Sequence, residues 1–153
     1  MNFKSIDEIL NFAIDREKEA VEFYTELSKK ESFAAVKETF QNFAREEQKH
    51  VNLIQDISGN KEIIDNYEFR KVADLKISDY MVDKEYEDGM PMQEVLRIAM
   101  KREEHSVKLY KELAEHADDS EFIRVFNLLA QEEAEHKLAL ETMYDDYLAD
   151  QDN

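Results

Sequence analysis

Residues 45–50 read REEQKH, and residues 131–136 read QEEAEH. Both stretches contain two adjacent glutamates, with a histidine three positions after the second glutamate. At the same separation of 86 residues, an Arg-Glu pair at 16–17 recurs at 102–103. The neighbouring apolar and aromatic positions follow this separation too, which indicates that the chain contains a duplicated pair of helices.

Apolar residues recur at steps of three and four positions in four segments, which is the spacing of amphipathic helices. Only two glycines and one proline occur in 153 residues, and helices tolerate these residues least. The pattern therefore predicts an all-α chain. The helices are expected at about residues 5–29, 33–58, 91–116 and 120–148.

Several residues are typical of helix ends. Ser32 is a candidate N-cap of the second helix, Gly59 is expected to end that helix, and Pro91 is favourable in the first turn of the third. The candidate caps of the fourth helix are Asp118, Asp119 and Ser120.

The connections between the helices differ in length. Short connections after the first and third helices favour antiparallel hairpins, whereas residues 59–90 form a long link. This link is rich in β-branched and aromatic residues, so we expect it to pack as a crossover with a short helix near residues 77–83; a disordered linker is the alternative. The prediction is a single domain over residues 1–153, an antiparallel four-helix bundle with a long crossover between its second and third helices.

Composition argues against several classes of function. The formal net charge of −17 disfavours binding to nucleic acid or to an anionic membrane, because both need clustered lysine and arginine. No apolar run approaches the roughly 18 residues of a membrane span, and the N-terminus lacks a signal-peptide pattern, so a cytoplasmic protein is expected. Without cysteine the chain has no thiolate ligand for a metal, and electrons must come from a separate donor.

The repeated Glu-x-x-His units are typical of a metal site. Residues three apart on a helix project to the same side, so each unit presents a carboxylate and an imidazole to one point. Both units fall on apolar stripes, where charged side chains are rare unless they are paired. Four glutamates carry a charge of −4, which two divalent cations would balance. The predicted ligands are Glu17, Glu47, His50, Glu103, Glu133 and His136.

Other polar residues near these units have different expected roles. Tyr24 and Tyr110 follow the first glutamate of each half by two turns, so each could orient a ligand carboxylate or simply fill the core. The residues expected to lie away from the metal are Glu19, Glu46, Glu104, Glu132, His105 and His116. Iron is the expected metal, as two ions cycling between Fe²⁺ and Fe³⁺; manganese or zinc would also suit these ligands.

Four segments of the sequence, given at the end of this paragraph, together resemble the rubrerythrin branch of the ferritin-like superfamily. The resemblance covers essentially the whole chain and implies a ferritin-like bundle that holds two metal ions. It places one ion with the glutamates and histidine of the first half and the other with those of the second, with two glutamates bridging. The segments are Glu17-x-x-Ala20-x-x-x-Tyr24, Glu46-Glu47-x-x-His50, Lys101-Arg102-Glu103 and Glu132-Glu133-x-x-His136.

The resemblance also implies a function. Because the chain resembles rubrerythrins, which reduce peroxide, we expect a di-iron oxidoreductase that reduces hydrogen peroxide or O₂ with electrons from a rubredoxin-like donor. The resemblance also implies a homodimer. This chain lacks the family's cysteine-ligated iron, and Ser106 stands where rubrerythrins place a further glutamate. A ferroxidase or iron-storage protein, or a metal-free structural bundle, therefore remain alternatives.

Overall fold

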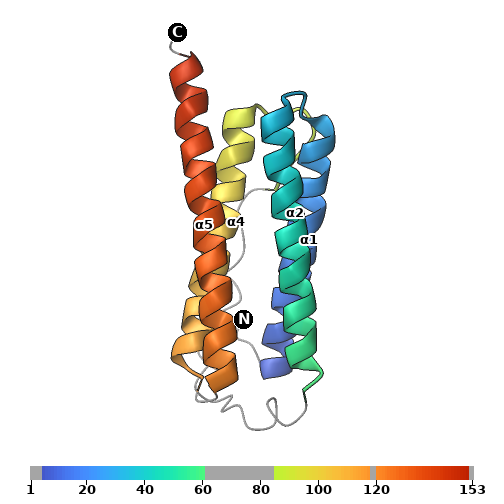
Figure 1. Ribbon diagram of the computed structural model, residues 1–153, viewed down its shortest axis with the longest axis vertical. Helices are drawn as coiled ribbons and strands as arrows, with labels where there is room; N and C mark the ends of the chain where they lie inside the picture. The colour runs from blue at the N-terminus through green and yellow to red at the C-terminus, as the bar shows by residue number, and fades with distance from the viewer. Residues whose placement is uncertain (1–4, 61–84, 118–119, 152–153) are drawn as a thin grey trace. The chain divides into compact units, whose positions relative to one another are not determined.

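The computed structural model describes residues 5–60, 85–117 and 120–151. Within these ranges the chain forms α-helices joined by short non-helical segments, and it contains no strand (Figure 1). All four helices begin and end within three residues of the predicted positions. The helices are α1 (Ile6–Lys30), α2 (Ala34–Ser58), α4 (Met92–Glu115) and α5 (Ser120–Gln151).

The helices belong to two compact units. One contains α1 and α2, the other contains α4 and α5, and within each unit the two helices pack along each other. In each unit the two helices run in opposite directions, so both units are antiparallel hairpins (Figure 1). Most of the crossover expected at residues 59–90, and the short helix expected near residues 77–83, lie outside the described residues.

The start of α1 shows why this segment is helical. The Ser5 side chain accepts a hydrogen bond from the backbone N–H of Glu8 at 3.0 Å, which satisfies a donor that the first turn leaves unpaired. Acidic residues occupy the first turn of α1, and Lys29 and Lys30 occupy the last, an order that favours the helix dipole.

The prediction that Ser32 caps α2 is wrong. Phe33 is the N-cap residue of α2 and makes no side-chain capping bond. Its backbone N–H donates instead to the Glu31 carboxylate at 3.0 Å, so the turn is stabilised from the residue before Ser32. Gly59 ends α2 as predicted, with its N–H bonded to the Gln55 carbonyl, and the carbonyl of Pro91 accepts two bonds from the first turn of α4.

Ser120 is the first residue of α5, not its cap. The residue before it, Asp119, and the other candidate cap, Asp118, lie outside the described residues.

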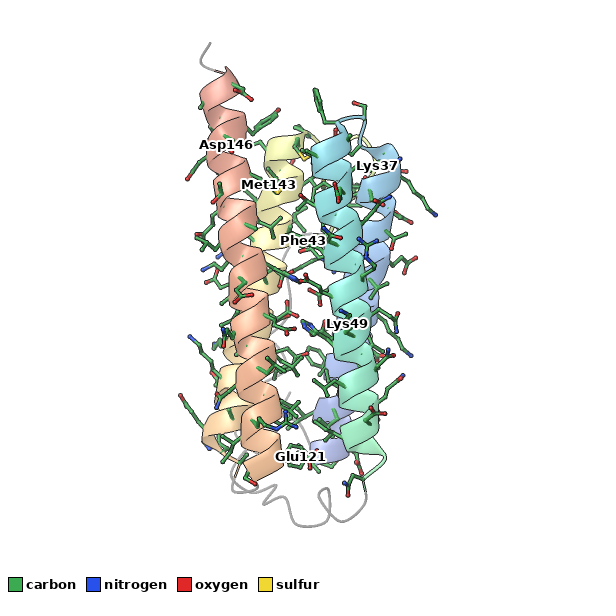
Figure 2. All side chains as sticks on the ribbon, viewed as in Figure 1. Lys37, Phe43, Lys49, Glu121, Met143 and Asp146 are labelled. Atoms are coloured by element: carbon green, nitrogen blue, oxygen red, sulfur yellow. The ribbon has the colours of Figure 1, made fainter. Side chains whose placement is uncertain are left out.

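The duplication extends to the packing of the cores. The Tyr24 ring stacks on Phe40 with 6.2 Å between the ring centroids, and Tyr110 stacks on Phe126 at the same 6.2 Å. In the first hairpin, Phe43 (labelled in Figure 2) adds an edge contact to Tyr24 at 5.2 Å. Matched positions are equally inaccessible to solvent, at 0% exposure: Ala13 and Ala99, Phe40 and Phe126, Ile54 and Leu140.

One contact distinguishes the second hairpin from the first. The Tyr144 hydroxyl on α5 accepts hydrogen bonds from Gln93 Nε2 at 3.3 Å and from Arg97 Nε at 3.0 Å, both on α4. The Arg97 guanidinium also lies 5.5 Å from the centre of the Tyr144 ring. The bonds from Gln93 and from Arg97 hold the pKa of the Tyr144 phenol below its usual range. The corresponding position of the first hairpin is Ser58.

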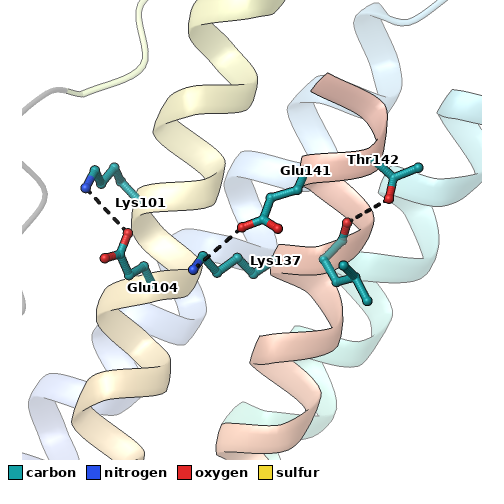
Figure 3. A network of polar contacts seen from close by, with 6 residues as sticks. Lys101, Glu104, Lys137, Glu141 and Thr142 are labelled. Carbon is teal, nitrogen blue, oxygen red and sulfur yellow. Dashed lines mark hydrogen bonds and ion pairs between the residues drawn. The ribbon is translucent and has the colours of Figure 1, made fainter. Parts of the chain in front are cut away.

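Exposed ion pairs line the outer surface of the second hairpin. Lys101 lies 3.4 Å from Glu104 on α4, and Lys137 lies 3.6 Å from Glu141 on α5 (Figure 3). Such pairs contribute little to stability because water and salt screen them. None of the described helices has both the length and the apolar character needed to cross a membrane.

Candidate metal centre

The first hairpin brings three predicted ligands together. Glu17 comes from α1, and Glu47 and His50 come from successive turns of α2. His50 Nδ1 lies 3.5 Å from Glu17 Oε2 and 3.4 Å from Glu47 Oε2. One donor atom from each of the three residues lies within 4.8 Å of the others, so a single cation can reach all three. We call these residues the first triad.

The second hairpin repeats the arrangement with Glu103 from α4 and with Glu133 and His136 from α5. His136 Nδ1 lies 3.6 Å from Glu103 Oε1, close to the distance between His50 and Glu17. Donor atoms of these three residues also lie within 4.8 Å of one another. This second triad shows that the sequence repeat corresponds to a repeat of the polar geometry.

All six side chains of the triads are buried. The glutamates are 1–2% exposed, His50 is 2% exposed and His136 is 3% exposed. A buried carboxylate loses its hydration, which costs several kcal/mol unless hydrogen bonds or opposite charge compensate for it. Burial therefore supports the prediction that these glutamates lie on the core side of their helices and need a positively charged partner.

The charge of each triad identifies the partner that fits. Each triad has two carboxylates and one imidazole, so at least one negative charge remains even when the imidazole is protonated. A divalent cation supplies the missing charge, and carboxylate oxygen with imidazole nitrogen is a donor set that suits iron, manganese or zinc. The residues present fit a metal ion, and their donor set does not choose among these metals.

The neighbouring acidic residues belong to neither triad. Glu19 and Glu104 are exposed, and they pair with Arg16 at 2.5 Å and with Lys101 at 3.4 Å. Glu46 is exposed beside the buried Glu47. The equivalent Glu132 is half-buried, as are the two remaining histidines, His105 and His116, and none of these belongs to a triad.

Tyr24 and Tyr110 are both 1% exposed and lie on the same helices as Glu17 and Glu103. Their rings stack on Phe40 and Phe126, which accounts for them as core residues. A role in orienting a ligand carboxylate stays a prediction.

Comparisons with known proteins agree with this architecture. The family model of rubrerythrin matches residues 8–144, so the chain belongs to the rubrerythrin family. Among curated protein sequences there is no significant match.

Two solved structures resemble the chain along almost its whole length. One, from Thermotoga maritima, is named as a candidate ferritin-like diiron-carboxylate protein; it is 25% identical, with a TM-score of 0.77, and the match covers 96% of this chain and 99% of that chain. The other is a hypothetical protein from Pyrococcus furiosus, also 25% identical, with a TM-score of 0.71 and coverage of 95% of this chain and 91% of that one. These matches confirm the predicted fold class, an all-α ferritin-like four-helix bundle.

Proposed function

We propose that the two triads jointly hold a pair of iron ions and that the protein is a non-haem di-iron oxidoreductase that reduces hydrogen peroxide or O₂. The observation that carries the proposal is the presence of two buried, matching sets of two glutamates and one histidine in a chain of the rubrerythrin family. In this arrangement Glu17, Glu47 and His50 would hold one ion, and Glu103, Glu133 and His136 would hold the other.

When bound, a ferrous pair supplies the two electrons that, with two protons, convert hydrogen peroxide to two molecules of water. The chain's own residues hold the ions and exclude bulk water, because every triad side chain is at most 3% exposed. The glutamates would supply carboxylate oxygens to the ions, and His50 and His136 would supply one imidazole nitrogen each. No cysteine occurs in the chain, so the electrons that restore the ferrous state come from an external donor, such as a rubredoxin-like protein.

A ferroxidase or iron-storage role is the second candidate, and Ser106 favours it. This residue is half-buried one turn after Glu103, where the resemblance to rubrerythrins leads us to expect a further glutamate. Because this further carboxylate is absent, the second hairpin offers the same set of candidate ligands as the first, two glutamates and one histidine. We propose a homodimer for the oxidoreductase, whereas storage requires a much larger closed assembly, and sedimentation of the native protein distinguishes the two.

The first expected result is a stoichiometry of two ferrous ions per chain. Each triad provides donors for one cation, and all six ligands belong to one polypeptide. Anaerobic titration followed by metal analysis of the desalted protein measures this number. Saturation at a single equivalent would show that the triads do not form two sites.

The oxidation of the iron-loaded protein tests the function itself. We expect hydrogen peroxide to oxidise the diferrous protein faster than O₂ does at matched concentration, and repeated turnover only when an external reductant is added. Rapid-mixing absorbance with the two oxidants in separate runs measures both rates, and free ferrous iron in the same buffer is the control. Faster oxidation by O₂, with iron accumulating beyond two ions per chain, would replace the first proposal by the ferroxidase.

A further inference from the structure

The helices of the two hairpins differ in their methionines. Residues 5–60, which include the whole first hairpin, contain no methionine, whereas α4 and α5 contain three. Each of the three stands where the repeat places an isoleucine in the first hairpin. The pairs are Met92 with Ile6, Met100 with Ile14, and Met143 with Ile57.

The positions of the methionines relate them to the second triad. Met100 lies one turn before Glu103, and Met143 lies two turns after His136, about 10 Å along the helix axis. Met92 lies eleven residues, or three turns, before Glu103, on the same side of α4. The three thioethers therefore lie on or near the ligand-bearing sides of α4 and α5, and we call them the methionine face.

The methionine face is more accessible than its counterpart. The three isoleucines of the first hairpin are buried, at 4–8% exposure, whereas all three methionines are half-buried. Met143 (labelled in Figure 2) directly precedes Tyr144, and Met92 directly precedes Gln93; a hydrogen bond between α4 and α5 joins Tyr144 and Gln93. A small oxidant can reach a half-buried thioether, while the side chain still contributes to helix packing.

We propose that the methionine face is a site of oxidative modification by hydrogen peroxide. A thioether sulfur attacks one peroxide oxygen, an S–O bond forms as the O–O bond breaks, and the second oxygen leaves as water with both protons. The sulfur is oxidised to the sulfoxide by two electrons and the peroxide is reduced by two. The step requires no metal ion, so it holds or fails independently of the di-iron proposal.

Oxidation changes the packing of the second hairpin alone. A sulfoxide is polar, and placing it at a half-buried position between packed helices disrupts contacts that a flexible apolar side chain made. The first hairpin has isoleucine at every matching position and isoleucine does not react with peroxide. The modification therefore acts directly on the packing of α4 and α5.

The experiment uses the metal-free full chain treated with hydrogen peroxide, with a methionine-containing peptide added as an internal reference. We expect mass spectrometry of proteolytic fragments to show one added oxygen at Met92, Met100 and Met143. The melting temperature should fall by about 4 °C or more, a shift that is measurable for a chain of this length. Hydrogen exchange should become faster in α4 and α5 only, and methionine sulfoxide reductases should restore the original rates.

The matched control is the triple variant Met92→Ile, Met100→Ile and Met143→Ile, which copies the first hairpin. Isoleucine has nearly the volume of methionine, so the untreated variant should fold and melt close to the wild type. After peroxide treatment its melting temperature should not change. The proposal is overturned if the three methionines stay unmodified while the reference peptide is oxidised, if the triple variant loses as much stability as the wild type, or if exchange rises equally in both hairpins.

Discussion

Replacing His50 with alanine should lower the affinity for one of two ferrous ions by more than about 100-fold. The loss should exceed the roughly 10–100-fold that follows from removing a residue that merely supports a ligand. His50 supplies the only nitrogen donor of the first triad and lies within 3.5 Å of both of its carboxylates. His136→Ala should cause a similar loss at the other ion, because the second triad repeats the geometry. Anaerobic titration of each variant measures the two affinities.

The chain offers matched controls for these variants. His105→Ala and His116→Ala remove half-buried histidines that belong to neither triad, so both should bind two ferrous ions as the wild type does. A strong effect of only one of the two triad variants would show that the halves are not equivalent. If neither variant changed the titration, the triads would not be the metal site.

Glu47→Leu should make the metal-free protein more stable. Without a cation the first triad buries two carboxylates beside one imidazole, so at least one negative charge stays uncompensated in the core. Leucine removes that charge, and Glu17 then remains with His50 at 3.5 Å as a balanced pair. The expected gain is about 1–2 kcal/mol, which corresponds to roughly 2–8 °C in melting temperature. Glu133→Leu should behave alike, since it leaves Glu103 with His136 at 3.6 Å.

The same variants should lose stabilisation by metal. A ligand that binds only the folded state stabilises it by about 2.7 kcal/mol at a hundredfold excess over its dissociation constant. Thermal unfolding with and without ferrous iron should therefore show a large shift for the wild type and a much smaller one for Glu47→Leu. The control is Glu46→Leu, which changes the exposed neighbour and should leave the metal response intact. A metal-free Glu47→Leu protein that melts below the wild type would contradict the inferred cost of burying this carboxylate.

The sequence was sufficient to predict the helices because their signals are local. The apolar stripes have the helical period over more than twenty residues, and Gly59 and Pro91 interrupt it at two ends. The prediction failed at Ser32, where capping depends on which side chain reaches the first free N–H. The Glu31 carboxylate takes the N–H of Phe33, a choice between neighbours that composition does not decide.

The meeting of two glutamates and one histidine within each hairpin could also be predicted, since Glu-x-x-His spacing and the 86-residue repeat place these residues on facing sides of consecutive helices. The contact of Tyr144 with Gln93 and Arg97 was not predicted. The contact joins side chains that are 47 and 51 residues apart in the chain. The residues at the matching positions of the first hairpin are of different types, so neither the helical period nor the duplication predicts the contact. This difference between the two hairpins is therefore visible in the folded structure and not in the sequence repeat.

The tight turn at Glu31–Phe33 has a consequence for how quickly the polypeptide acquires its structure. Because α1 pairs with the helix that follows it directly, and α5 with the helix before it, the packing within each hairpin joins segments that are near one another in the chain. Closing so short a loop costs little entropy, and proteins dominated by such local contacts fold in microseconds to milliseconds. Each set of two glutamates and a histidine can thus be in place early in folding, before any contact that must wait for distant parts of the chain.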